Sequence, residues 1–302
     1  MSDHSNIEWT DATWNPTTGC TKVSPGCANC YIERTPAFRI AGRRFERGHI
    51  PLLLHENRLE QPLHWRKPRR VFVNSLSDLF HDDVPDAFID RVFAVMALCQ
   101  QHTFQVLTKR PRRMRLWMQR HEQRHPNHVN VVLPDPVRPE PAIVVVERAR
   151  KWPLPNVWLG VSIENQRFAD ERFPLICELG EAGWNTMVSL EPLLGRVVIP
   201  ARYLALGSRA WLVEGGESGK NSRRHDIEWA RAIYRQATAA GVAFFEKQLG
   251  ANAEVQHGCG DCDPCASGQR CSLGYNVRME LRHKKGGDIA EFPPDLQIRE
   301  FP

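Results

Sequence analysis

The sequence predicts an α/β fold, a full or partial (β/α) barrel of the TIM type with a small C-terminal metal-bound lobe. Short β-rich runs alternate with helical patterns, which is typical of a parallel sheet built from βα units. The chain has 302 residues, 42% of them hydrophobic, and such barrels commonly use about 250 residues as one domain. Four closely spaced cysteines follow the last run. We therefore expect the barrel over residues 1–250, and the cysteine-rich lobe and a C-terminal tail over 251–302.

The expected strands are nearly continuous in apolar residues, as strands buried on both faces of a sheet are. They cover residues 71–75, 103–108, 157–163, 186–190, 210–214 and 242–245. Periodicity predicts helices over 86–101 and 226–240, and the second begins at an acidic cap, Asp226, and ends at Gly241. Seven prolines interrupt the alternation over residues 124–155, which favours an inserted loop or lid.

The sequence shows no basic and apolar leader and no stretch near the roughly 18 apolar residues that cross a bilayer. We therefore expect a cytoplasmic protein that does not enter a membrane. Its formal charge of +5 is uneven, because residues 1–125 hold 19 Lys and Arg against 13 Asp and Glu. The basic runs at 64–70 and 108–115 have two interpretations: they contact a phosphate backbone, or they form a solvated helix face. The first interpretation favours a nucleic acid or nucleotide substrate.

Polar side chains follow every expected strand, at the edge where parallel α/β barrels place their active sites. The first three runs are followed by Asn74, Ser75, Ser77 and Asp78, by Thr108, Lys109 and Arg110, and by Ser162, Glu164 and Asn165. The last three are followed by Ser189 and Glu191, by Glu214, Gly215, Gly216, Glu217 and Ser218, and by Glu246, Lys247 and Gln248. Each such residue either lines a site or caps the next helix. Six strand ends in succession favour a site.

The nine cysteines include two, Cys99 and Cys177, that lie in apolar helical patterns and are expected in the core. Three others, Cys20, Cys27 and Cys30, lie in a Gly- and Pro-rich segment with C-x6-C-x2-C spacing. Thiolates on one flexible loop can bind three corners of a cubane iron–sulfur cluster and leave the fourth iron open to a cofactor. A zinc site completed by a remote histidine is the main rival, and unliganded thiols are the third interpretation.

The remaining four cysteines, Cys259, Cys262, Cys265 and Cys271, have C-x2-C-x2-C-x5-C spacing with turn residues between them. Four thiolates this close predict a closed tetrahedral metal site that orders its own loop. Zinc and an auxiliary iron–sulfur cluster both fit this spacing. We favour structural zinc, because the segment has few apolar residues to shield a redox centre.

Nine blocks of sequence, taken in order, resemble a family of phage-associated proteins with a three-cysteine motif, which look like divergent radical S-adenosylmethionine enzymes. They include V-S-P-G-C-A-N-C-Y around the first cysteine group, V-N-S-L-S-D-L-F-H, and G-G-E-S-G. The blocks are residues 14–16, 19–20, 23–31, 73–81, 105–111, 155–166, 189–195, 215–219 and 244–248. The resemblance therefore covers most of the chain.

This resemblance implies a [4Fe-4S] cluster on Cys20, Cys27 and Cys30, with S-adenosylmethionine bound to the open iron through its amino and carboxylate groups. One electron from an external donor would cleave the sulfonium and release a 5′-deoxyadenosyl radical that abstracts a hydrogen atom from substrate. The spacing departs from the commonest pattern of such enzymes, C-x3-C-x2-C. In addition, Asn29 replaces the aromatic residue before the last cysteine, and Tyr31 follows it. This departure changes the expected geometry of the loop more than it changes the expectation of a bound cluster.

Position along the chain suggests which residues bind the cofactor and the substrate. The aminoacyl end of S-adenosylmethionine is assigned to Asn74, Ser75 and Asp78, its ribose to Ser162 and Glu164, and a further cofactor contact to Tyr31. Three residues would face the substrate, as carboxylates or an ammonium that pair with polar groups or move protons, namely Lys109, Glu191 and Glu217.

The expected reaction is repair or modification of a nucleic acid such as DNA, or of a nucleotide, with a partner protein as a further participant. The alternative is a non-catalytic, zinc-dependent nucleic-acid-binding protein in which both cysteine groups hold zinc. Iron content and release of 5′-deoxyadenosine separate these two classes.

Overall fold

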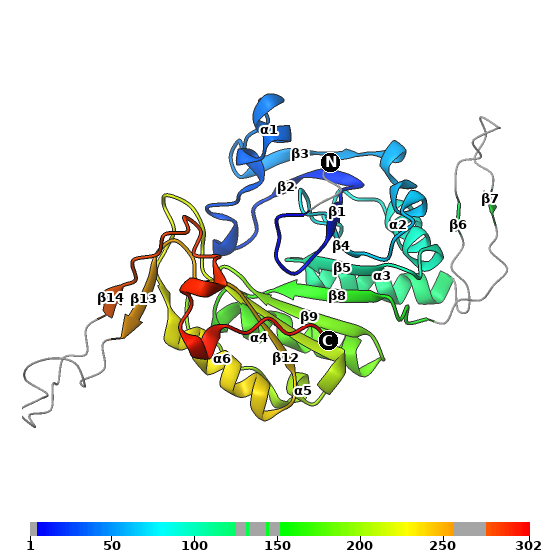
Figure 1. Ribbon diagram of the computed structural model, residues 1–302. Helices are drawn as coiled ribbons and strands as arrows, with labels where there is room; N and C mark the ends of the chain where they lie inside the picture. The colour runs from blue at the N-terminus through cyan, green and yellow to red at the C-terminus, as the bar shows by residue number, and fades with distance from the viewer. Residues whose placement is uncertain (1–4, 125–130, 133–142, 145–151, 257–275) are drawn as a thin grey trace, which may run out of the picture. The chain divides into compact units, whose positions relative to one another are not determined.

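The computed structural model describes residues 5–124, 131–132, 143–144, 152–256 and 276–302 (Figure 1). The second cysteine group, Cys259 to Cys271, and most of the expected insertion lie outside these residues. The chain divides into two compact units. The first comprises Met1–Ser162 and Arg172–Met187, and the second comprises Ile163–Glu171 and Val188–Pro302.

Seven strands form one sheet whose order follows their order along the chain. They are β1 (Ala12–Trp14), β4 (Arg70–Val73), β5 (Thr103–Thr108), β8 (Val157–Ser162), β9 (Asn185–Leu190), β10 (Ala210–Gly215) and β12 (Ala243–Gln248). The pairs β1–β4, β4–β5, β5–β8 and β10–β12 are parallel. All six expected strands are confirmed, and β1 is an addition. Among the described residues the order ends at β1 and β12, so this mixed α/β fold is compatible with a partial barrel.

The first unit places two helices after its sheet strands, α2 (Asp86–Leu98) after β4 and α3 (Pro111–Arg124) after β5. Large aromatic side chains fill its core. The ring centroids of Phe93 and Trp117 are 4.4 Å apart, and those of Trp152 and Trp184 are 4.8 Å apart at nearly a right angle. Such tilted and edge-to-face contacts add to the free energy that burial of the rings supplies. The core thus fixes the strands whose ends carry the candidate site.

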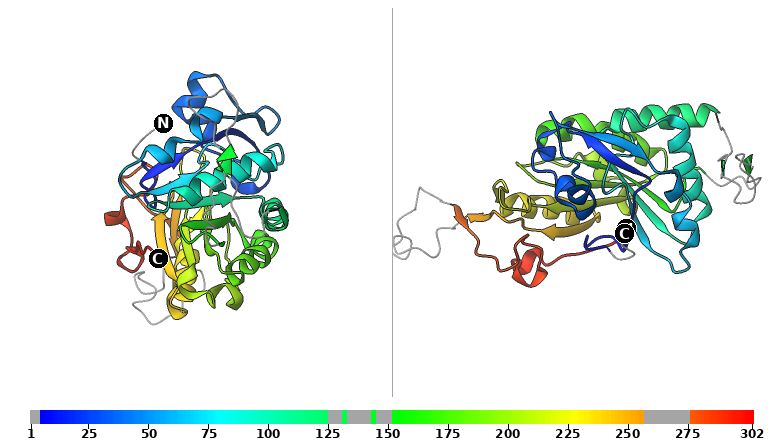
Figure 2. Two further views of the ribbon diagram at one scale, coloured as in Figure 1. Left: turned by 90° about the vertical axis from the view of Figure 1, so that its right-hand side faces the viewer. Right: turned by 90° about the horizontal axis from the view of Figure 1, so that it is seen from above.

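A hairpin of β2 (Thr17–Thr21) and β3 (His49–Leu54) forms a second, antiparallel sheet in this unit, and helix α1 (Pro36–Ile40) lies in the connection. Gly19 forms a bridge with Ser77, so the hairpin lies beside the segment that follows β4 (Figure 2). The sequence T-T-G-C-T of β2 is polar, and its strand conformation results from pairing with β3.

The second unit contains helix α6 (Ile227–Ala239), which confirms the expected helix. The Asp226 carboxylate accepts a hydrogen bond from the Glu228 backbone N–H at 3.0 Å and caps the first turn. Gly241 follows the helix at φ +65°, a left-handed conformation that glycine adopts without strain. The buried residues recur at helical spacing and are Ile227, Ala230, Ile233 and Ala237.

The C-terminal segment packs within the second unit. It begins with β14 (Asn276–Arg278), which pairs with β13 (Ala253–Gln256) in a sheet that also contains β11 (His225–Asp226). Phe292 and Leu296 join the apolar cluster that contains Ile227, and the Ile298 carbonyl accepts a hydrogen bond from the Glu246 N–H at 2.9 Å. Residues 276–302 therefore contribute side chains to the core of this unit.

The remaining elements are short, apart from helix α4 (Gln166–Glu181). They are helix α5 (Ala201–Leu204), the paired strands β6 (Val131–Val132) and β7 (Ile143–Val144), and the 3-10 turns Pro25–Cys27, Ile32–Arg34, Glu56–Arg58, Gln61–His64, Gly207–Arg209, Ile289–Glu291 and Pro294–Leu296. Cys99 and Cys177 are buried, which confirms their place in the core. Within the described ranges, no helix has the length and apolarity to span a membrane.

Candidate functional site

The three N-terminal cysteines are free, partly buried thiols held by three different local structures. Cys20 lies on β2 opposite Ile50 of β3, Cys27 ends the 3-10 turn Pro25–Cys27, and Cys30 follows in the next turn. Only Cys27 and Cys30 lie on a loop of the kind expected, because pairing with β3 makes Cys20 part of a strand. Cys20 and Cys30 pack against the same small apolar cluster, which consists of Ile32, Phe38 and Ile50.

The hairpin position of Cys20 depends on Gly19. This residue has φ +101°, and a Cβ there would lie 2.1 Å from the Pro51 carbonyl oxygen. Its N–H donates a hydrogen bond to the Leu76 carbonyl at 3.1 Å, which holds β2 against the chain beyond β4. Glycine is therefore required by both the backbone conformation and the close approach of β3.

Two cations hold the turn that joins Cys27 to Cys30. The Lys22 ammonium donates to the Ala28 carbonyl at 2.9 Å, and the Arg34 guanidinium donates to the Asn29 carbonyl at 2.9 Å. The two carbonyl oxygens are thus bound to side chains outside the turn. This arrangement fixes the peptide planes between the two thiols.

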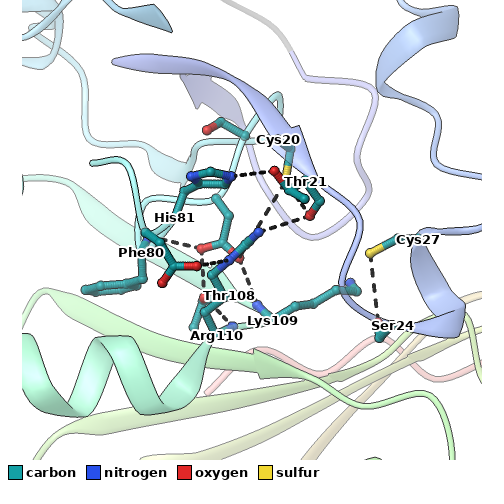
Figure 3. Close-up of polar contacts among 12 residues, drawn as sticks. Cys20, Thr21, Ser24, Cys27, Phe80, His81, Thr108, Lys109 and Arg110 are labelled. Atoms are coloured by element: carbon teal, nitrogen blue, oxygen red, sulfur yellow. Dashed lines mark hydrogen bonds and ion pairs between the residues drawn. The ribbon is translucent and has the colours of Figure 1, made fainter. Parts of the chain in front are cut away.

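Each of the three sulfurs has a polar hydrogen-bonding neighbour. Arg110 Nη1 donates to Cys20 Sγ at 3.9 Å (Figure 3). The Ser24 hydroxyl and Cys27 Sγ are 3.8 Å apart, and the backbone N–H of Ile32 donates to Cys30 Sγ. Hydrogen bonds to sulfur stabilise thiolates and are among the interactions that tune sulfur-ligated metal centres.

Burial and nearby charges keep Cys20 and Cys30 in the thiol form. Burial and the Asp78 charge raise the pKa of Cys20 to about 12, against the opposing charge of Arg110. Burial and the Cys27 charge likewise raise the pKa of Cys30, against Lys109 and Lys22. The Cys27 charge acts on both neighbours, so a thiolate at Cys27 would repel one at Cys20 or at Cys30. Metal binding removes the thiol protons and offsets that repulsion.

Among the described residues, no group of three or more His, Cys, Asp or Glu side chains is arranged to hold one metal ion. A single ion needs its ligands around one point, whereas a cubane cluster takes each thiolate on a different iron. The chemistry of the donor set, three free thiols that each have a hydrogen-bonding neighbour, is that which three corners of such a cluster would need.

Asp78 and Arg110 connect the thiols to the ends of β4 and β5. Asp78 Oδ1 accepts from Thr108 Oγ1 at 2.7 Å and from the Phe80 N–H at 3.0 Å. Its Oδ2 accepts from the Lys109 N–H at 3.0 Å and from Arg110 Nη1 at 3.1 Å. Arg110 Nη2 donates to the Thr21 carbonyl at 3.0 Å. Both oxygens of Asp78 therefore have partners within the chain.

The structure brings Asn74, Ser75 and Tyr31 together at the end of β4. Asn74 is buried in a left-handed conformation at φ +60°, and its Oδ1 accepts from the Thr17 N–H at 3.3 Å. Its Nδ2 is buried and has no hydrogen-bond partner among the described residues. The Tyr31 hydroxyl donates to the Ser75 carbonyl, and the Ser75 hydroxyl donates to Asn15 Oδ1 at 3.2 Å. An unused amide donor is thus present at the end of β4.

Two other sequence-predicted residues belong to the first unit. Lys109 follows β5, and its charge acts on Cys30, so its ammonium lies toward the thiols. Ser162 ends β8 and is buried, and its carbonyl accepts from Arg172 Nη1 at 2.6 Å.

The carboxylates predicted from the later strands lie in the second unit. Glu191 forms an ion pair with Lys247. Glu217 is buried and takes two side-chain hydrogen bonds from Arg223, at 2.9 and 2.5 Å. Glu164 is fully buried, and its carbonyl accepts from the Leu194 N–H at 2.7 Å.

A buried acid pair with a histidine, which the sequence did not single out as a unit, also lies in the second unit. Glu214 and Glu246 are Cα partners on β10 and β12. His225 Nε2 is 2.8 Å from Glu214 Oε1, and its Nδ1 is 2.9 Å from the Leu249 carbonyl oxygen. A carbonyl only accepts, so Nδ1 carries a proton. His225 stands in the basic sequence R-R-H-D, where nothing local indicates burial.

These observations define a mixed α/β protein with a cluster of three thiols beside the carboxyl ends of parallel strands. A family model described as "Protein of unknown function (DUF5131)" matches residues 4–289, and the chain belongs to this family. Comparisons with curated proteins and with solved structures gave no match.

Proposed function

We propose that this protein is a radical S-adenosylmethionine-type iron–sulfur enzyme that generates a 5′-deoxyadenosyl radical. The observation that carries the proposal is the set of three free thiols, Cys20, Cys27 and Cys30, each with a hydrogen-bonding neighbour, beside the ends of β4 and β5. These residues would hold a [4Fe-4S] cluster. When bound, the cluster would supply the electron that cleaves S-adenosylmethionine, and an external one-electron donor would replace it.

The chain's own residues would bind and orient the cofactor. The buried Nδ2 of Asn74 is a donor without a partner among the described residues, and a cofactor carboxylate would satisfy it. Ser75 follows Asn74 in the chain and its carbonyl accepts from the Tyr31 hydroxyl, and both residues would line the aminoacyl end. Ser162 ends β8, Glu164 lies two residues further on, and they are the candidates for the ribose hydroxyls.

The substrate side of the proposal rests on Lys109, Glu191 and Glu217. The two carboxylates now pair with Lys247 and Arg223, so a substrate would bind by competing with those cations or alongside them. The basic excess of residues 1–125 supports a nucleic acid or nucleotide substrate. Repair or modification of such a substrate in the cytoplasm, with a partner protein, remains the proposed setting.

Four further thiols, Cys259, Cys262, Cys265 and Cys271, are proposed to hold zinc or a second iron–sulfur cluster. They lie outside the described residues. Zinc and iron analysis of Cys262→Ser/Cys265→Ser protein identifies this metal directly, because only the metal of the second group is expected to fall.

The decisive experiment for the cluster is iron and sulfide analysis after anaerobic reconstitution. Cys20→Ala, Cys27→Ala and Cys30→Ala are each expected to lose about four irons per chain relative to wild type, together with the brown thiolate–iron absorption. Cys99→Ala removes a buried core thiol and is expected to keep the iron. A colourless wild-type protein that binds zinc through the first cysteine group after the same treatment would overturn the proposal.

A further inference from the structure

We propose that Arg110, fixed by Asp78, is a positioning residue that sets the reduction potential of the cluster through the Cys20 thiolate. The inference rests on the proposed function, because it concerns the metal centre that Cys20 would help to hold. It assigns a role to two residues from different strand ends, and it gives Cys20 a hydrogen bond from a cation where Cys27 and Cys30 have neutral hydrogen-bonding neighbours.

Arg110 is held on three sides in the first unit. Its Nη1 lies 3.1 Å from Asp78 Oδ2 and 3.9 Å from Cys20 Sγ, and its Nη2 donates to the Thr21 carbonyl at 3.0 Å. The side chain is buried, with 8% of it exposed. A planar guanidinium with these contacts cannot turn away from the sulfur without breaking the bond to Asp78 or to Thr21.

The Asp78 carboxylate is also held by hydrogen bonds from residues other than Arg110. Thr108 Oγ1 and the N–H groups of Phe80 and Lys109 donate to its carboxylate, as described above. The Thr108 hydroxyl also accepts from the Arg110 N–H at 2.9 Å, so one side chain joins both members of the ion pair. The position of the charge therefore follows from the ends of β4 and β5 rather than from the flexible arginine side chain.

The three thiols differ in their neighbours. Cys27 is next to a neutral hydroxyl, and Cys30 accepts from a neutral backbone N–H, whereas Cys20 accepts from a cation. Charge-assisted hydrogen bonds are about twice as strong as neutral ones. A buried positive charge at a sulfur ligand stabilises the added electron, and cluster potentials depend on net charge and hydrogen bonds to sulfur. Loss of Arg110 also leaves the Asp78 charge without its partner, which acts in the same direction.

The test is a mediated redox titration of the reconstituted protein, followed by electron paramagnetic resonance. Arg110→Gln is expected to lower the midpoint potential by at least one tenfold change in the one-electron equilibrium, about 59 mV. Arg110→Lys keeps the positive charge but loses the planar guanidinium, and its midpoint potential is expected to lie between those of wild type and Arg110→Gln. Arg110→Gln combined with Asp78→Asn removes the whole pair and is expected to recover part of the shift.

Arg112→Gln is the matched control, because Arg112 is exposed and lies two residues further on. It removes the same charge and is expected to keep the wild-type potential. A midpoint potential equal to wild type in Arg110→Gln overturns this inference and leaves the proposed function intact. If Arg110→Gln retains no iron, the same result in Arg110→Lys overturns it. A wild-type protein that takes up no cluster removes the proposed function, and this inference with it.

Discussion

Glu214 and Glu246 face each other across the parallel strands β10 and β12, and neither side chain is exposed to solvent. Burial, followed by the charge and hydrogen bond of Glu214, raises the pKa of Glu246 well above its ordinary value. Burial beside Glu214 therefore favours the neutral form of Glu246, while Glu214 Oε1 lies 2.8 Å from His225 Nε2. Glu214 Oε2 and both oxygens of Glu246 have no other hydrogen-bond partner among the described residues, so a proton shared between the two carboxyl groups gives Glu214 Oε2 and one Glu246 oxygen a partner.

This arrangement predicts unequal effects of two isosteric changes. Glu246→Gln keeps a neutral hydrogen-bond donor and is expected to change the free energy of unfolding by at most about 1 kcal/mol. Glu214→Gln removes the negative partner of buried His225 and is expected to cost about 3–5 kcal/mol. Urea unfolding of the two variants measures both values. Equal losses, or a larger loss for Glu246→Gln, would show that the proton is not on Glu246.

The same pair predicts how stability depends on pH. The folded pKa of Glu246 exceeds its ordinary 4.5, so the folded chain keeps a proton that the unfolded chain releases. Its contribution to the free energy of unfolding therefore falls as the pH rises above 4.5. The wild-type value minus the Glu246→Gln value should thus decrease between about pH 5 and pH 8 in urea titrations. Parallel pH profiles for the two proteins would contradict the raised pKa.

His225 also makes the free energy of unfolding fall as the pH rises. Burial alone would lower its pKa, but the charge and hydrogen bond of Glu214 outweigh burial and raise it above 6.5. Its stabilisation is present in full below pH 6.5 and is lost as the pH rises through the folded pKa.

The hairpin that carries Cys20 provides a test with a matched glycine. Gly19→Ala introduces a Cβ at φ +101° against the Pro51 carbonyl and is expected to cost about 2 kcal/mol or more and to reduce iron uptake. Gly42→Ala has φ +64° but no atom within 4 Å of the new Cβ, so only the backbone strain of about 1 kcal/mol remains. Thermal unfolding and iron analysis compare them. Similar behaviour of the two variants would mean that the approach of β3 to Gly19 is not what places Cys20.

Asn74 tests the cofactor contact separately from the cluster. Asn74→Gly tolerates the left-handed backbone at φ +60° and removes the unpartnered Nδ2. It is expected to retain iron and to bind S-adenosylmethionine at least about tenfold more weakly, or about 1.4 kcal/mol, in equilibrium dialysis. The exposed Asn57→Gly serves as the control. Unchanged affinity in Asn74→Gly would remove Asn74 from the cofactor site.

The sequence predicted the sheet well because its strands are buried on both faces and therefore read as continuous apolar runs. It did not predict β2 and β3, since T-T-G-C-T is polar and its strand conformation depends on partners 28 to 37 residues away. β1 has only three residues and shows no run of its own. A local sequence pattern predicts a strand where the residues are uniformly buried. It fails where pairing with a distant strand alone determines the conformation.

For the candidate site, too, the sequence predicted some features and left others undetermined. Spacing was enough to single out the three cysteines, but the basic run 108–115 suggested either phosphate contact or a solvated face. In the structure Arg110 of that run is buried against Asp78, and Arg113 pairs with Asp86 at 2.5 Å. His225 was missed for a similar reason, because its burial follows from contacts with Glu214 and Leu249 that lie far along the chain.

The most direct measurement of the central claim is the release of 5′-deoxyadenosine from S-adenosylmethionine. The reconstituted wild-type protein is incubated without oxygen with dithionite, and the nucleoside is quantified by mass spectrometry. Wild type and Cys99→Ala are predicted to release 5′-deoxyadenosine, whereas Cys20→Ala, Cys27→Ala and Cys30→Ala are predicted to release none above the protein-free blank. Release that persists in all three variants, or no release from a wild-type protein that carries its cluster, would contradict the account.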